Sequence, residues 1–307
     1  MNAQPAIRAP RVSAGQCLDF IAVAVCTLAW GTTWFAITLQ FGVVDPVVSI
    51  VYRFALAATL LFAWCALRGE TLRMTKAQHL AALGVGLFTF SFNYAFVYWA
   101  EERVTSAVVA VMFAAMAFIN LIAFRITFQQ RAAPLAWFAA SLGVIGVVLL
   151  SWEELTAANM SARAWIGIGL TLAAVLASCI GNVYARRGEL AGAGVAASTG
   201  WAMAYGTMLL AVFALTTGKV WNFDFSWSYV LSLMHLALIG SVLAFLLYYG
   251  LARRRGYALA SYISALTPPV AMLVSALFED KSWGLLALGG VALVLLGQVL
   301  LMRARKA

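Results

Sequence analysis

Residues 104–124, VTSAVVAVMFAAMAFINLIAF, form a run of 21 residues without a charged side chain. Glu101, Glu102 and Arg103 precede the run, and Arg125 follows it. An α-helix rises about 1.5 Å per residue, so roughly 20 apolar residues cross the hydrocarbon core of a bilayer, which is about 30 Å thick. This stretch therefore predicts a transmembrane helix.

Similar runs follow one another along the chain. Of its 307 residues, 64% are hydrophobic and only 10% are charged, with a mean hydropathy of +0.93, whereas soluble domains carry about 25% charged residues. The first run follows Arg8 and Arg11 but lacks a small-residue cleavage site near its end, so we expect it to be retained. Breaks at charges, glycine and proline predict ten helices, at 18–39, 46–67, 78–100, 104–124, 132–151, 163–185, 194–217, 229–250, 257–278 and 282–302. The predicted fold is an all-α polytopic membrane protein.

The distribution of basic residues predicts the orientation. Cytoplasmic loops of membrane proteins are enriched in lysine and arginine, and here a cytoplasmic amino terminus places 15 of the 20 cations inside. Both chain ends are then cytoplasmic. Only Arg103, Arg163, Lys219 and Lys281 face outward, while Arg53 lies within the second helix. The cytoplasmic set is Arg8, Arg11, Arg68, Arg73, Lys76, Arg125, Arg131, Arg186, Arg187, Arg253, Arg254, Arg255, Arg303, Arg305 and Lys306.

The sequence also repeats itself weakly. A shift of 151 residues aligns Tyr98 with Tyr249 and Gly146 with Gly297, and it keeps the order of the helices. Five helices is an odd number, so the second half enters the membrane in the opposite direction. We therefore predict two inverted repeats, residues 1–154 and 155–307, an arrangement that many secondary transporters use for alternating access. Gene duplication without alternating access is the other reading.

Several stretches resemble the EamA-type drug/metabolite transporters. They are Ala29-Trp30-Gly31, Tyr52-Arg53-Phe54, Thr267-Pro268 followed by Glu279, and the tail helices around Gly146 and Gly297. Within that superfamily, the spacing and the aromatic third helix resemble the YddG-type exporters of aromatic amino acids. The resemblance implies a cavity lined by the third, fourth, eighth and ninth helices, mobile first, second, sixth and seventh helices, and a scaffold of the fifth and tenth. Ala117 departs from the pattern at the place of Pro268, so the first half is expected to lack the corresponding kink.

Polar and aromatic residues near helix middles are the candidate site residues, because an apolar span carries few polar groups that do not face a cavity or another helix. The alternative for each is helix packing. The substrate-binding candidates are Trp30, Thr33, Phe90, Asn93, Tyr94, Ser178, Asn182, Ser241, Ser264 and Thr267. The structural or gating candidates are Gly31, Arg53, Tyr98, Gly181, Tyr249 and Pro268.

Arg53 is the one cation inside a predicted span. A charged side chain at this depth is costly in lipid, so the guanidinium requires water, a partner or a ligand. It either extends to the surface, pairs with a neighbour such as Asp45, or attracts a carboxylate.

All eleven acids fall in termini, loops or helix ends of the predicted topology. The absence of a carboxylate in the middle of a span argues against binding a proton, a sodium ion or an organic cation there. We therefore predict export of neutral or zwitterionic solutes, above all aromatic or hydrophobic amino acids, by facilitated diffusion through a uniporter. Another metabolite, such as a nucleotide sugar or an amphipathic drug, and a passive channel remain alternatives.

Other classes are less compatible with the sequence. A membrane-embedded enzyme would need a nucleophile with a base or clustered acids and histidines, but the two histidines, His79 and His235, lie on different helices. No metal, cofactor or nucleotide-phosphate motif is present, and scattered cations do not suggest nucleic acid. We expect no enzymatic activity, a small-molecule substrate and lipid as partners, and a monomer in the inner (plasma) membrane, with oligomers still possible.

Overall fold

The structure is a computed structural model that describes residues 14–157, 161–260, 262–278 and 283–303. Within these ranges the regular secondary structure is helical, without strands. Seven helical stretches of the described part are long and apolar enough to cross a membrane, and three shorter apolar stretches accompany them, Pro134–Gly146, Leu266–Phe278 and Leu285–Gly297. The prediction of an all-helical protein with many apolar segments of membrane length is confirmed.

Each predicted range coincides with one or more helical segments of the structure. The first part of the chain contains α1 (Ala14–Thr38), α2 (Pro46–Leu67), α3 (Lys76–Val85), the π-helical segment η1 (Gly86–Asn93), α4 (Tyr94–Glu101), α5 (Ser106–Met112), the 3-10 turn η2 (Phe113–Ala115), α6 (Met116–Phe128) and α7 (Pro134–Ala157). The second part contains α8 (Ala162–Leu190), α9 (Val195–Thr216), α10 (Trp227–Met234), the π-helical segment η3 (His235–Leu243), α11 (Ala244–Arg255), α12 (Tyr257–Ala260), α13 (Tyr262–Phe278) and α14 (Leu285–Arg303).

Helix ends differ from the predicted ranges where local interactions extend or cap the helix. Thr75 and Gln78 form a reciprocal capping box, so α3 begins at Lys76 instead of residue 78. α8 continues past its apolar run to Leu190, and Arg186 pairs with Glu189 within this extension. The chain then turns at Gly192, whose φ of +77° favours glycine.

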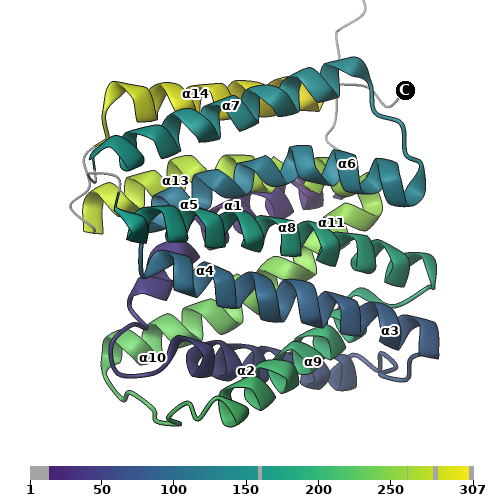
Figure 1. Cartoon of the computed structure of the whole chain (residues 1–307). Helices are drawn as coiled ribbons and strands as arrows, with labels where there is room; N and C mark the ends of the chain where they lie inside the picture. Colours follow the sequence, from purple (N-terminus) through teal and green to yellow (C-terminus); the bar gives the residue numbers. More distant parts are fainter. Residues whose placement is uncertain (1–13, 158–160, 261, 279–282, 304–307) are drawn as a thin grey trace, which may run out of the picture.

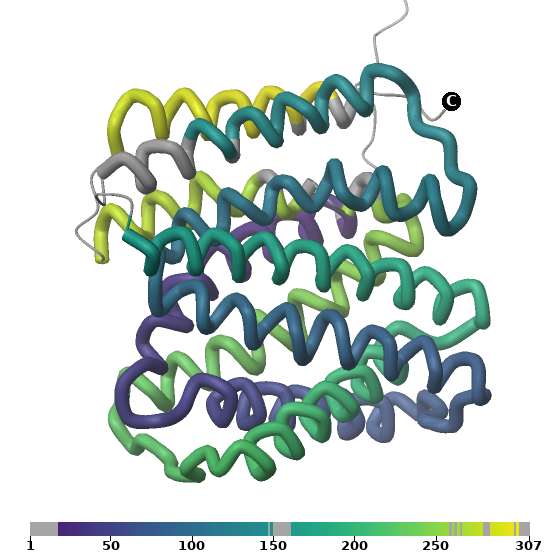
Figure 2. Tube along the Cα trace, viewed as in Figure 1, coloured from purple at the N-terminus to yellow at the C-terminus, as the bar shows by residue number. Residues whose placement is uncertain are grey.

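The helices run side by side and nearly along one direction (Figure 1). The pair α7 and α14 forms one edge of the bundle, and α2, α9 and α10 lie at the opposite edge. The trace in Figure 2 shows that segments from the start and the end of the chain alternate through the bundle, with α1 beside the late helix α13. The core therefore combines helices from both parts of the chain.

Glycines allow α7 and α14 to touch. A Cβ atom at Gly146 would lie 2.4 Å from the carbonyl oxygen of Gly290, and one at Gly297 would lie 2.4 Å from that of Ala139. Backbone atoms cannot move aside as a flexible side chain can, so both positions require glycine. The two residues that the sequence repeat aligns thus make equivalent contacts.

Two loops at one end of the bundle are joined. Lys219 Nζ lies 2.9 Å from Asp45 Oδ2, and Asn222 Nδ2 donates to the carbonyl of Val43 at 2.8 Å. The Tyr52 hydroxyl donates to the Asn222 carbonyl at 2.9 Å. The first two contacts connect the loop before α2 to the loop after α9, and the third connects α2 itself to the same loop.

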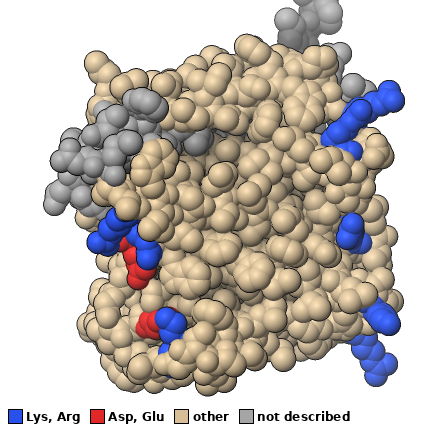
Figure 3. Space-filling view, viewed as in Figure 1, with Lys and Arg blue, Asp and Glu red and all other residues tan. Residues whose placement is uncertain are grey.

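Charged side chains avoid the middle of the outer surface that Figure 3 shows. On the face in Figure 3, uncharged residues cover the broad central zone, and charged residues lie toward the two ends. The left end of that face shows both acidic and basic residues, while the right end shows only basic ones. Such a surface is suited to a hydrocarbon layer between two aqueous boundaries.

Candidate functional site

The bundle encloses a central cavity with a volume of about 70 Å³, which is room for a few water molecules. Its lining residues come from α1, α2, η1, α4, η2, α6, α8, α11 and α13. Neither α7 nor α14 contributes a lining residue. The lining residues are Trp30, Thr33, Trp34, Ile37, Arg53, Thr89, Asn93, Tyr94, Val97, Phe113, Met116, Ser178, Asn182, Phe245, Tyr248, Tyr249, Ser264 and Thr267.

The structure brings most of the predicted site residues together around this cavity. The substrate-binding candidates that line it are Trp30, Thr33, Asn93, Tyr94, Ser178, Asn182, Ser264 and Thr267. The remaining two, Phe90 and Ser241, lie behind the wall. Phe90 packs its ring 5.0 Å from those of Phe54 and Phe245, and Ser241 is fully buried against Arg53.

Aromatic side chains form much of the wall. The Trp30 ring lies 5.3 Å from the rings of Phe245 and Tyr248, and its Nε1 donates to the carbonyl of Gly240 at 3.1 Å. The rings of Trp34 and Phe113 are 5.0 Å apart. The cavity can therefore surround an apolar or aromatic body, because flat rings at these separations offer large contact areas.

The small polar groups of the wall mainly bond to backbone. Asn93 Nδ2 donates to the carbonyl of Ala174 at 2.8 Å, and Thr33 Oγ1 donates to that of Trp30 at 3.0 Å. Thr267 Oγ1 donates at 3.0 Å to the carbonyl of Ser264, which Pro268 leaves without its helical N–H partner. These bonds support the packing role for Asn93, Thr33 and Thr267, although their side chains also face the cavity.

Arg53 is the charged member of the wall and is only 1% exposed. Its Nε donates to Ser241 Oγ at 2.9 Å, and its Nη2 lies 3.5 Å from the Tyr94 hydroxyl. The prediction that it extends to the surface or pairs with Asp45 is wrong. Asp45 instead caps α2 and pairs with Lys219, which lies at the same end of the bundle.

Tyr98 and Tyr249, which are 151 residues apart, differ in their relation to the cavity, because Tyr249 lines it and Tyr98 does not. Tyr98 is fully buried; its hydroxyl donates to Gln40 Oε1 at 2.8 Å, and its ring lies 6.2 Å from that of Phe41. Tyr249 lines the central cavity and also a second, smaller pocket of about 20 Å³. The Tyr249 ring is therefore a partition between these two spaces.

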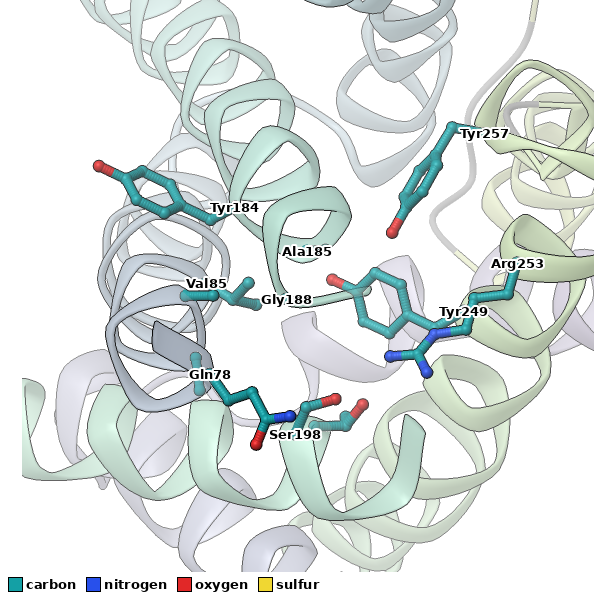
Figure 4. A pocket seen from close by; sticks show the side chains of 12 residues that line it. Gln78, Val85, Tyr184, Ala185, Gly188, Ser198, Tyr249, Arg253 and Tyr257 are labelled. Carbon is teal, nitrogen blue, oxygen red and sulfur yellow. The ribbon is translucent and has the colours of Figure 1, made fainter. Parts of the chain in front are cut away.

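The second pocket lies between the ends of α3, α8, α9, α11 and α12. Figure 4 shows Tyr249, Tyr257 and Arg253 on one side of it and Gln78 on the other. Arg253 Nη1 donates to the carbonyl of Ala193 in the loop before α9. The pocket thus adjoins the helix ends for which the sequence predicts a cytoplasmic location.

The predicted glycines and proline act through the backbone. A Cβ at Gly31 would lie 2.5 Å from Val270 Cβ, and one at Gly181 would lie 1.8 Å from Thr89 Oγ1, so each allows a close helix crossing. Pro268 lies inside α13, which continues through it. In the matching stretch near Ala117, by contrast, the 3-10 turn η2 interrupts the helix just before that residue.

Some lining residues were not predicted from the sequence. Phe245 and Tyr248 precede Tyr249 on α11, and the spacing of three residues places the first two on one face. That aromatic spacing was a signal available in the sequence. Thr89 and Met116 had no such signal in the sequence. Thr89 lies in η1 and Met116 directly follows η2, and these irregular turns change which side chains face inward.

A bundle of apolar helices around a small, mostly apolar cavity defines a polytopic membrane protein of the transporter class. The chain belongs to the EamA-like transporter family, whose model matches residues 19–152 and again residues 165–303. This family indicates a transporter rather than an enzyme.

Three similar proteins agree with the family. The chain is 30% identical over 256 residues to the uncharacterized inner membrane transporter YedA of Escherichia coli, a match that covers 83% of this chain and 81% of YedA. It is 24% identical over 264 residues to the protein PagO of Salmonella typhimurium, with 84% and 83% covered. It is 25% identical over 299 residues to the protein PecM of Dickeya dadantii, with 94% of both covered. A solved crystal structure shares the fold, with a TM-score of 0.70 at 18% identity over 96% of this chain and all of the other.

Proposed function

We propose that the protein exports small neutral or zwitterionic organic solutes, in particular aromatic or hydrophobic amino acids, by alternating access and facilitated diffusion. The observation that carries this proposal is the aromatic-walled cavity among helices from both parts of the chain. The resemblance to YddG-type exporters supports the same substrate class.

The proposed architecture has ten membrane spans in two inverted repeats, residues 1–154 and 155–307, with both ends cytoplasmic in the inner membrane. The double match of the family model, to residues 19–152 and 165–303, supports a repeat. So do the equivalent glycine contacts of Gly146 and Gly297. Cysteine labelling of the two chain ends in intact and opened cells tests the topology, and labelling from opposite sides would overturn it.

The proposed cycle requires the cavity to widen. Its volume of about 70 Å³ is smaller than an aromatic amino acid needs, so in the proposal the site expands when a substrate binds. In the proposal, Tyr98 and Tyr249 close opposite ends, and α7 with α14 provides the fixed scaffold. A substrate is admitted when one tyrosine end opens while the other stays closed.

Counterflow in proteoliposomes tests the proposal. The purified protein, which we expect to be a monomer, is reconstituted into vesicles that contain excess unlabelled phenylalanine. Labelled phenylalanine is then added outside, and its uptake into the vesicles is measured. Saturable uptake stimulated by the internal solute is expected. Movement only of nucleotide sugars or quaternary amines would overturn the substrate class. Uptake driven by an imposed proton gradient alone would overturn facilitated diffusion, and linear, unstimulated flux would indicate a channel.

A further inference from the structure

We infer that Arg53 binds the carboxylate of the transported solute, and that an aromatic or hydrophobic monocarboxylate without an ammonium group binds at least as tightly as the matching amino acid. This inference rests on the proposed function and gives its site a charge preference. Arg53 is the one ionisable side chain that is charged at neutral pH among the described residues that line the cavity.

The hydrogen-bond partners described for the guanidinium are uncharged. Its described partners, Ser241 and Tyr94, are hydroxyl groups, and neither carries a negative charge. Its Nη1 has no hydrogen-bond partner among the described residues. A buried cation without an anion is unfavourable, and so an arriving carboxylate gains both a charge partner and a free N–H donor.

The guanidinium is also held in place. It lies over the Tyr94 ring, 4.6 Å from the centroid, and 5.2 Å from that of Phe54. Gly240 lies beside it: a Cβ there would be in ordinary contact with Nη2, at 3.4 Å, but only 2.5 Å from Thr33 Cγ2. Two rings and a serine thus fix the charge before a ligand arrives, and little side-chain order has to be gained on binding.

The corresponding position in the second half of the chain carries no charge. Shifting the sequence by 150 residues places Met203 at the position of Arg53, in α9, and Met203 is fully buried. An uncharged residue therefore fills the corresponding place in the second half. Arg53 is better explained by a ligand than by the architecture.

The cavity wall also lacks an acid for an ammonium group. None of the lining residues is an aspartate or glutamate. In a cavity of about 70 Å³, a ligand ammonium would lie near the Arg53 charge, and like charges repel. The geometry therefore favours a monocarboxylate at least as much as the matching zwitterion, and both over an amine.

Three probes with the same aromatic body test the inference on the wild-type protein. They are phenylalanine, 3-phenylpropionate, which lacks the ammonium group, and phenethylamine, which lacks the carboxylate. Inhibition of labelled phenylalanine counterflow is expected to be at least as strong with 3-phenylpropionate as with phenylalanine, and at least tenfold weaker with phenethylamine. Equal or stronger inhibition by phenethylamine would overturn the inference. If no aromatic solute shows counterflow at all, the proposed substrate class fails instead.

Variants of Arg53 extend the test. Arg53→Gln is expected to reduce the preference for 3-phenylpropionate over phenethylamine by at least tenfold, and Arg53→Lys is expected to retain part of it. Arg68→Gln is the matched control, because Arg68 follows the end of α2 and contacts Trp64 outside the cavity. An unchanged preference in Arg53→Gln would contradict carboxylate binding by Arg53. The ligand series on the wild type decides the matter even where the glutamine variant fails to fold.

Discussion

The two π-helical segments, η1 and η3, occupy corresponding places in the two parts of the chain but contain different chemistry. In η1, Ser91 Oγ is bonded to the carbonyls of Gly86 and Gly206, at 3.1 and 3.2 Å. In η3, Ser241 Oγ donates to the Leu236 carbonyl at 2.8 Å and accepts from Arg53. The serines are 150 residues apart. One segment uses its serine to join backbones, and the other uses it to position a charge.

This difference suggests that η1 serves mainly helix packing, while η3 also serves the binding site. At η1 the helices meet closely, because a Cβ at Gly206 would lie 2.7 Å from Phe90 Cβ. At η3 the helices also meet closely, since a Cβ at Gly240 would lie 2.5 Å from Thr33 Cγ2, but here the Arg53 side chain of α2 adds a hydrogen bond to Ser241. Wide helical turns of this kind are frequent at functional sites. The comparison predicts that changes at η1 lower stability, while changes at η3 and its arginine lower transport.

The largest effect is expected from Arg53→Met. Loss of one partner of a buried charge pair costs about 2–5 kcal/mol, so carboxylate transport should fall roughly 100-fold. Stability should stay the same or rise, because the substitution removes a buried cation whose hydrogen-bond partners, Ser241 and Tyr94, are uncharged. Counterflow and thermal unfolding in detergent measure the two effects. A strongly destabilised variant would show that Arg53 is structural and would break the comparison.

Gly86→Val should mainly affect folding. A Cβ at Gly86 would lie 2.7 Å from the carbonyl oxygen of Ala202 and 2.9 Å from Tyr205 Cβ. Overpacking of this kind costs about 1–3 kcal/mol. The measurement is the midpoint of thermal unfolding. Gly240→Ala is the corresponding variant in η3, where the added Cβ would lie 2.5 Å from Thr33 Cγ2 beside Arg53, and it should lower transport as well as stability.

Ser241→Ala and Ser91→Ala sharpen the comparison at single atoms. Ser241→Ala frees Arg53 Nε and should weaken carboxylate affinity about fivefold to tenfold, since a hydrogen bond is worth about 1 kcal/mol. Ser91→Ala should lower stability by about 1 kcal/mol and leave affinity unchanged. Competition by 3-phenylpropionate and chemical unfolding of both variants provide the test. The reverse pattern would contradict the division of roles.

Tyr98→Phe should have the smallest effect. It removes the hydrogen bond to Gln40 Oε1 and should cost about 1 kcal/mol or less at that end. If Tyr98 closes the cavity there, exchange through the loosened end becomes modestly faster. Tyr249→Phe is the control at the other end. Single-turnover efflux and counterflow compare the two, and slower exchange in Tyr98→Phe would argue against a closing role.

The sequence was sufficient for the helical framework because its signals are long and local. Runs such as residues 104–124 predict helices with ends only a few residues from those observed, and Gly146 with Gly297 indicated a repeated contact. Most polar candidates meet around one cavity for a related reason, since few polar groups are placed in an apolar span without a role.

The remaining features depend on contacts between distant segments. The pairing of Asp45 with Lys219 joins residues 174 positions apart and left Arg53 without the predicted acid. The π-helical turns of η1 and η3 shift the inward-facing positions, so Phe90 and Ser241 lie behind the wall while Thr89 lies in it. A regular helical period cannot anticipate such a shift.

The contacts of Lys219 and Asn222 with the loop before α2 have a mechanical consequence. They couple α2 to α9 at one end, where the two helices also pack along each other. In the proposed cycle, a tilt of α2 that moves the arginine would carry α9 with it, so the two helices would move as one rigid pair. Spin labels on α2 and α9 would keep a constant separation through the cycle, while their distances to α7 change.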